Sequence, residues 1–110
     1  MPFTINGTLD ADGVLHCALS GELDLVGVPI LRNYLDARLA LDTVAEVQAD
    51  LSAVTFMDSS GIGALIACLR RANEHGKTFR IVNARGRVLE VLDLTNVTAL
   101  LTGGTVGPAN

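Results

Sequence analysis

The strongest pattern in the sequence is an apolar stripe of helical period that lies between two strand-like segments. Along residues 62–72 the apolar side chains recur at intervals of three and four, as they do on one face of a helix. Residues 44–51 before this stripe alternate between apolar and polar side chains, and residues 79–83 after it predict a short strand. A helix between two strands is the usual connection of parallel strands, so the pattern predicts an α/β fold.

The other segments extend this alternation of strands and helices to the whole chain. Residues 3–9 and 14–19 predict two strands joined by a turn at 10–13, and residues 21–24 predict a loop. Helices are expected from Pro29 to about residue 41 and over residues 87–94, and a last short strand over 97–101. The predicted fold class is a single α/β domain with a mixed, mostly parallel sheet of four to five strands and about three helices.

The length of 110 residues suits one compact domain, predicted over residues 1–102. Residues 103–110 contain three Gly, one Thr, one Pro and one Asn and have little to bury, so a flexible C-terminal tail is expected there.

Composition excludes several classes of protein. With 49% hydrophobic and 18% charged residues, most of the chain should fold. The longest nearly apolar run, residues 62–69, is far shorter than the about 20 residues of a membrane span. Residues 1–10 lack the pattern of a signal peptide, and two cysteines are too few for a disulfide framework or a thiolate zinc site. A cytoplasmic protein without metal or cofactor is expected.

Charge argues against a nucleic-acid or membrane partner. Twelve acidic against eight basic residues give a net charge of −4, and nine of the acids but only two of the bases precede residue 70. Such a chain has no general attraction to nucleic acids or anionic lipids. Only one aromatic residue, Phe79, lies among the bases after residue 69, so a solvated rim explains these bases.

The segment Asp58-Ser59-Ser60-Gly61 stands at the predicted start of the middle helix. Its simplest interpretation is an ordinary N-cap, because Asp and Ser are common helix starters. The positive end of the helix dipole would also accommodate a phosphate on Ser59. Glycines at positions 61 and 63 suggest that something approaches the helix closely. No dinucleotide fingerprint, P-loop or nucleophile elbow is present.

Two stretches together, residues 21–24 (Gly-Glu-Leu-Asp) and residues 50–65, resemble the anti-sigma factor antagonists of the STAS-domain family. The resemblance spans roughly residues 3–101, and residues 56–63 are its most specific part. It implies a non-enzymatic domain that binds an anti-sigma factor, usually a serine kinase, and thereby releases a sigma factor. Phosphorylation of the antagonist by that kinase ends the binding. Members commonly end in an amphipathic helix, which residues 102–110 cannot form, so this helix is expected to be missing or frayed.

The resemblance also implies roles for individual residues. The phosphoacceptor falls on Ser59, Asp58 matches the acidic neighbour that binds the partner, and Asp24 matches a residue of the same docking face. Ser60, Gly61 and Gly63 match the partner-binding start of the helix.

Three alternatives stay open. The first is that the chain forms a homodimer. The same fold can serve as a STAS subunit of a lipid-transport or signalling complex without kinase control. An enzyme with Ser59 as nucleophile would need an activating base, and the sequence shows no orienting partner for His16 or His75.

Overall fold

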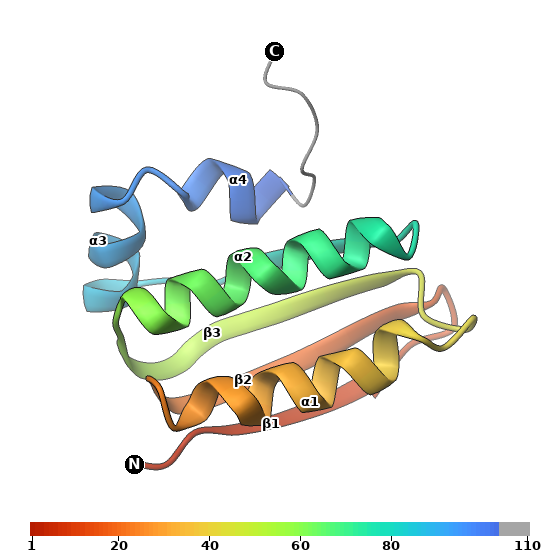
Figure 1. The fold of residues 1–110 in the computed structure, drawn as a ribbon, viewed down its shortest axis with the longest axis horizontal. Helices are drawn as coiled ribbons and strands as arrows, with labels where there is room; N and C mark the ends of the chain where they lie inside the picture. The colour runs from red at the N-terminus through yellow and green to blue at the C-terminus, as the bar shows by residue number, and fades with distance from the viewer. Residues whose placement is uncertain (104–110) are drawn as a thin grey trace.

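The computed structural model describes residues 1–103 of the chain, which form a four-stranded sheet and four helices. The strands are β1 (Thr4–Leu9), β2 (Val14–Leu23), β3 (Glu46–Met57) and β4 (Thr78–Val82), and the helices are α1 (Gly27–Leu39), α2 (Ser59–Glu74), α3 (Gly86–Leu94) and α4 (Thr98–Gly103) (Figure 1). The predicted α/β class and the mixed sheet are confirmed. Residues 104–110 of the predicted tail lie outside the described residues.

The sheet keeps the order of the chain, β1-β2-β3-β4. β1 pairs antiparallel with β2, whereas β2–β3 and β3–β4 are parallel. The antiparallel pair is a hairpin, because Gly13 takes a φ of 84° and Asp10 Oδ1 accepts hydrogen bonds from the N–H groups of Asp12 and Val14 at 2.8 and 3.0 Å. The two parallel pairs are joined through α1 and α2, as the helical stripes predict.

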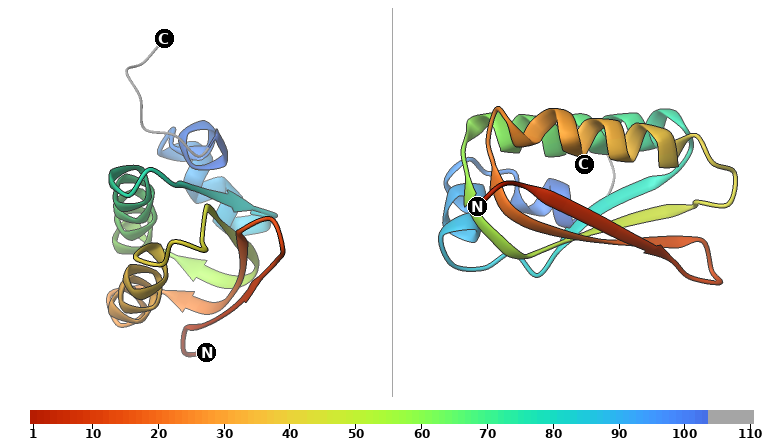
Figure 2. Two further views of the ribbon diagram at one scale, coloured as in Figure 1. Left: turned by 90° about the vertical axis from the view of Figure 1, so that its right-hand side faces the viewer. Right: turned by 90° about the horizontal axis from the view of Figure 1, so that it is seen from below.

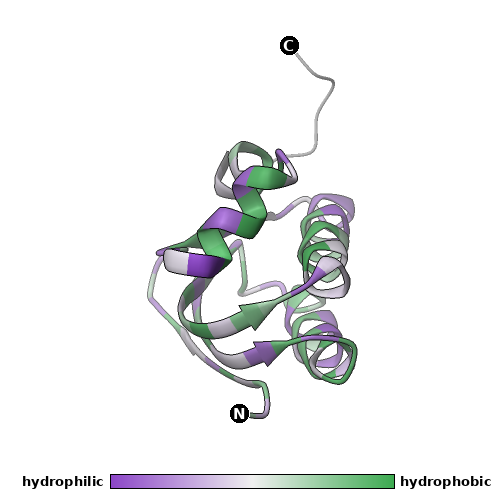
Figure 3. Cartoon of the chain, turned by 90° about the vertical axis from the view of Figure 1, so that its left-hand side faces the viewer, coloured by the Kyte–Doolittle hydropathy of each residue, from purple (hydrophilic) through white to green (hydrophobic). Residues whose placement is uncertain are grey.

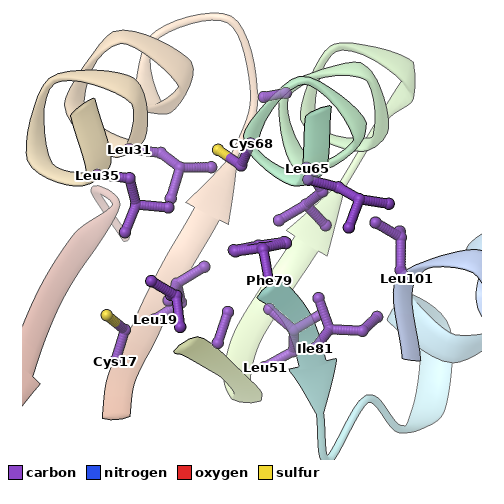
Figure 4. Close-up of a cluster of buried hydrophobic side chains, with 14 of the residues drawn as sticks. Cys17, Leu19, Leu31, Leu35, Leu51, Leu65, Cys68, Phe79, Ile81 and Leu101 are labelled. Atoms are coloured by element: carbon purple, nitrogen blue, oxygen red, sulfur yellow. The ribbon is translucent and has the colours of Figure 1, made fainter. Parts of the chain in front are cut away.

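Helices α1 and α2 lie side by side on one face of the sheet (Figures 1 and 2). The core between the two layers consists mainly of leucines, including Leu31 and Leu35 of α1, Leu65 of α2 and Leu19 of β2 (Figure 4). Phe79 of β4 is fully buried among them. The sides of α1 and α2 that face the sheet are largely apolar (Figure 3), which is the reason these segments form helices at this place.

The structure corrects the predicted strand over residues 97–101, because residues 98–103 form the helix α4. Thr98 Oγ1 donates a hydrogen bond to Asp93 Oδ1 at 2.6 Å, and Asn96 turns the chain with a φ of 58°. The helix packs against β4 and α2 and buries Leu101 completely. The expected absence of a C-terminal helix was therefore wrong: a helix is present, but it begins before residue 102, and the helices number four among the described residues.

Two strands are longer than predicted. β2 includes Gly21 to Leu23, where a loop was expected, and β3 continues to Met57 rather than ending at residue 51. The pairing of β2 with β3 shifts register between Ala18 and Ser20 and again between Gly21 and Glu22. Such bulges break the simple alternation of apolar and polar residues, which hides a strand from a periodicity analysis.

Leu101→Ala tests the packing of α4. The side chain is 0% exposed, so its truncation should lower the free energy of unfolding by about 2–4 kcal/mol. Leu94→Ala is the matched control, because Leu94 is 84% exposed and its loss should change stability by less than about 0.5 kcal/mol. Urea denaturation followed by circular dichroism measures both. Equal effects of the two substitutions would contradict the position of α4.

Candidate functional site

The turns that follow β2 and β3 lie next to each other at the carboxyl-terminal edge of the sheet, which is formed by the ends of the strands and not by a side strand. Leu23 and Met57, the last residues of these parallel strands, are partners in the register. Asp24 and Asp58 come directly after them, and α1 and α2 begin just beyond. Figure 3 looks onto this edge of the domain, where both helices start. Two acidic residues that are 34 positions apart in the sequence thus meet at the carboxyl ends of neighbouring strands, the usual place of binding sites in such sheets.

Asp58 is the N-cap of α2. Its backbone is extended, with φ −117° and ψ −170°, and its Oδ1 accepts hydrogen bonds from the N–H groups of Ser60 and Gly61 at 2.9 and 3.2 Å. Its carbonyl oxygen accepts from the N–H of Ile62 at 3.1 Å. The N-cap interpretation of this segment is therefore confirmed, and Asp58 rather than a serine provides the cap.

Asp24 has the same role before α1. Its Oδ1 accepts hydrogen bonds from the N–H groups of Val26 and Gly27, both at 3.0 Å, and its carbonyl oxygen accepts from the N–H of Val28. The carboxylates of Asp24 and Asp58 thus each bind two backbone N–H groups at a helix start. This use of the carboxylates holds both turns in one conformation.

Gly61 and Gly63 differ in what surrounds them. A methyl group at Gly61 would lie 2.5 Å from the carbonyl oxygen of Leu23 and 2.9 Å from Cγ of Met57, so this buried glycine permits α2 to pack against the ends of β2 and β3. The close approach inferred for Gly61 is therefore made by the chain itself. Gly63 is exposed and has open space around its Cα, so packing of the described residues does not require a glycine there.

The six predicted site residues all lie at this edge, but only some are accessible. Ser59 and Gly63 are exposed and, at a spacing of four, share one face of α2. The remaining polar residues, Asp24, Asp58 and Ser60, are half-buried, and Gly61 is buried. The face that a partner could contact is thus centred on Ser59 and Gly63.

Three exposed apolar side chains at the same edge were missed from the sequence. Leu25 and Val26, in the turn before α1, are 75% and 78% exposed, and Phe56 near the end of β3 is 44% exposed. Exposed apolar side chains that gather at one place are typical of protein interaction sites. Two consecutive apolar residues between Asp24 and a helix were the available signal, but the turn itself had to be known before they could be placed on the surface.

Neither histidine is near Ser59. His16 lies near the start of β2, at the opposite end from Leu23, and its Nε2 is 2.9 Å from Asp10 Oδ2. Asp10 is thus an orienting partner of His16 that the sequence did not reveal. His75 is the C-cap of α2, about 24 Å along the helix from Ser59 at 1.5 Å per residue. The activating base that a serine nucleophile needs is not supplied by these histidines.

The two cysteines are buried core residues. Burial raises the pKa of the Cys17 thiol to about 11 and that of the Cys68 thiol to about 12. Both thiols lie in the buried cluster of Figure 4. They stay protonated at neutral pH, which makes them poor nucleophiles and metal ligands.

The face of the sheet opposite α1 and α2 carries polar side chains around a hollow of about 250 Å³. Asp50 and Asn83 line this hollow, and their side chains are hydrogen-bonded to each other at 3.0 Å. Next to it, Glu46 binds the side chains of Gln48 and Arg80 at 2.7 and 3.1 Å. These polar groups largely satisfy one another.

Residues 1–103 contain no helix that is both long and apolar enough to cross a bilayer. Within the same residues, no group of three His, Cys, Asp or Glu side chains is placed to hold a metal ion.

Comparison with known proteins identifies the family. The sequence model of the family described as "Mlab, STAS domain" matches residues 7–102. The chain belongs to the STAS domain family. It is 28% identical to the anti-sigma-B factor antagonist of Staphylococcus epidermidis over 94 residues. This alignment covers 86% of each of the two chains. Among solved structures, an anti-sigma factor antagonist from Mycobacterium paratuberculosis is 32% identical, with a TM-score of 0.72 over 89% of this chain and 83% of that one.

A second solved structure shares the fold at lower identity. The phosphorylated form of the Bacillus cell fate determinant SpoIIAA is 18% identical and superposes with a TM-score of 0.69 over 90% of this chain and 88% of that one. The resemblance inferred from residues 21–24 and 50–65 is therefore confirmed at the level of family and fold.

Gly61→Ala and Gly63→Ala form a matched pair that tests the packing at the start of α2. The added methyl group at position 61 meets the backbone of β2, so the free energy of unfolding should fall by about 1–3 kcal/mol. At position 63 it meets open space, and stability should stay unchanged or rise by about 0.5 kcal/mol because alanine favours the helix. Thermal and urea unfolding measure both. A destabilised Gly63→Ala variant would contradict the described surroundings of Gly63.

Glu46→Gln tests the charged cluster on the open face. The hydrogen bond from Gln48 and the charge of Arg80 lower the pKa of Glu46 below its ordinary value of 4.5. A lowered pKa stabilises the fold above pH 4.5, and this contribution is lost as the pH falls below that value. The variant should therefore be less stable than the parent at pH 7, and the difference should shrink by pH 3. Urea unfolding at the two pH values measures it; a difference independent of pH would refute the ionic contribution.

Proposed function

We propose that this chain is an anti-sigma factor antagonist that binds its anti-sigma factor through the edge carrying Ser59, and that phosphorylation of Ser59 abolishes the binding. The observation that carries the proposal is the exposure of Ser59 on the first turn of α2, beside a cap that Asp58 alone provides. The antagonists among its relatives supply the class of partner.

A phosphate on Ser59 changes the surface without disturbing the fold. The hydrogen bonds that start α2 go to Asp58, so no cap is lost when the hydroxyl of Ser59 is modified. The added charge of about −1.5 to −2 is attracted by the helix N-terminus and repelled by the neighbouring carboxylate of Asp58. These two effects oppose each other within the same turn. The phosphorylated relative keeps the same fold, which agrees with this expectation.

The same charge is costly in an interface. Leu25, Val26 and Phe56 offer apolar area at the same carboxyl ends of the strands where Ser59 lies, and a partner that covers them removes water from this edge. A phosphate buried there without a positive partner costs several kcal/mol. Since about 1.4 kcal/mol corresponds to a tenfold change in affinity, one phosphate is sufficient to weaken the complex by two or more decades.

The partner we propose is an anti-sigma factor of the serine-kinase type. It would transfer the terminal phosphoryl group of ATP to Oγ of Ser59 and release ADP and a proton. In this scheme the chain is a substrate and not an enzyme, in agreement with the distance of both histidines from Ser59. The role places the chain in the cytoplasm, where a sigma factor acts in transcription.

A second candidate function uses the same edge without the kinase, as a STAS subunit of a lipid-transport or signalling complex. The exposed apolar side chains at positions 25, 26 and 56 would serve such a contact equally well. Stable co-purification with a transport ATPase, with Ser59 unmodified, would favour this candidate.

Substitutions of Ser59 test the switch. Ser59→Ala should bind the anti-sigma factor regardless of kinase and ATP, because it cannot accept a phosphate. Ser59→Asp should bind at least about tenfold more weakly than the parent, because it places a charge in the same interface. Isothermal titration calorimetry with the purified anti-sigma factor measures both affinities. Parent-like affinity of Ser59→Asp would sink the electrostatic mechanism.

Ser60→Ala is the matched control for this test. Ser60 is the neighbouring hydroxyl, half-buried on the first turn of α2. After incubation with the kinase and ATP, intact-mass analysis should find one added phosphate on the parent and on Ser60→Ala, and none on Ser59→Ala. A phosphate retained in Ser59→Ala would assign the modification to another residue.

A further inference from the structure

The two edges of the sheet differ in how they are protected. β4 has only five residues, includes Arg80, follows Lys77 and packs against α4. β1, with the sequence Thr-Ile-Asn-Gly-Thr-Leu, contains neither a charged residue nor a proline, and among residues 1–103 it pairs only with β2. Edge strands normally carry charges, prolines or a covering element, because their free N–H and C=O groups invite another strand. β1 lacks these safeguards.

The helix next to β1 has an apolar side toward the same edge. Helix α1 lies over β1 and β2, and the hydroxyl of Tyr34 packs directly on Gly7 of β1. Ile30 and Ala37 are exposed and lie four residues before and three residues after Tyr34, so they belong to the same side of α1. Arg38 on this side stacks its guanidinium on the ring of Tyr34, 3.5 Å from the centroid. Strand and helix together thus form a two-layer edge that is mostly uncharged.

We propose that this edge is the interface of a homodimer, in which β1 pairs antiparallel with β1 of a second copy around Gly7. The sequence of β1 is self-complementary in this register. Ile5 then faces Leu9 of the second copy on the helix side, and Asn6 faces Thr8 of the second copy on the open side, because residues of one parity share one face of a strand. A shift by one residue would oppose polar and apolar faces.

The helices also fit this arrangement. Strands in a sheet are about 4.8 Å apart, so two α1 helices that each lie over β1 and β2 would be about 10 Å apart across the two-fold axis. This is the ordinary distance of packed helices. The apolar sides carrying Ile30, Tyr34 and Ala37 would meet there, and an isologous contact of this kind closes as a dimer. Ser59 and Gly63 lie on α2, away from β1, so the dimer leaves these two residues accessible.

Charge substitutions at the open side of β1 test both the dimer and its register. In Asn6→Lys/Thr8→Lys, each lysine faces a lysine of the second copy, whereas in Asn6→Lys/Thr8→Asp each lysine faces an aspartate. Like charges opposite each other destabilise a strand pair, and opposite charges stabilise it. We expect the dissociation constant of the dimer to rise roughly tenfold or more in the first variant and to stay near the parent's in the second.

Sedimentation equilibrium of the full chain, from about 1 µM to 1 mM, measures the assembly without any partner protein, so its outcome is independent of the proposed function. The parent should change with concentration from 11.5 kDa toward twice that mass. Leu94→Lys/Ala99→Lys adds the same charge on exposed positions of α3 and α4 and should not alter the dimer.

Three results would overturn the proposal. A parent chain that stays at 11.5 kDa throughout has no such dimer. A dimer that persists unweakened in Asn6→Lys/Thr8→Lys uses another surface, and loss of the dimer in both β1 variants excludes the register around Gly7. Circular dichroism verifies that each variant is folded.

Amide hydrogen exchange of the parent is a second measurement: protection of the β1 amides should increase with concentration, and unchanged protection would contradict the pairing.

Discussion

The contact of Gly61 with the ends of β2 and β3 is the constraint on which the proposed site depends. The Cα of this glycine sits so close to the carbonyl oxygen of Leu23 that no side chain fits between them. The first turn of α2 is thereby held against the turn that leads from β2 into α1. Asp24 and Asp58 stand on the two sides of this contact, and each uses its carboxylate to cap the backbone beyond it. Ser59 consequently projects from a rigid turn.

The cap that Asp58 provides at this turn bears on the proposed switch at Ser59. Because the carboxylate of Asp58 accepts from the N–H groups of Ser60 and Gly61, the hydroxyl of Ser59 is not needed to cap them. In the proposed switch, a modification of Ser59 would therefore alter recognition by a partner that covers Leu25, Val26 and Phe56, while the domain stays folded. The side edge of the sheet at β1 differs from this site, since β1 is uncharged and β2 separates it from β3.

Much of the architecture was predictable because apolar periodicity reports which faces are buried. The stripes of α1 and α2, the alternation in the first half of β3 and the hairpin turn at Gly13 were all read correctly. Prediction failed where the period breaks. The bulges between β2 and β3 concealed the ends of both strands, and the run at 97–101 was too short to distinguish a strand from the helix α4, whose Leu101 is held by tertiary packing.

The sequence by itself determined the fold class, the family and the serine at the helix start, because these depend on local patterns and on residues that are neighbours in the chain. Only the tertiary structure decided the surroundings and the backbone contacts of the predicted site residues. It assigned Gly61 to internal packing and left Gly63 open, it made Asp24 a cap, and it placed Leu25 and Val26 on the surface. The physical reason is that burial and close approach depend on segments distant in the chain, which meet only when parallel strands align their carboxyl ends.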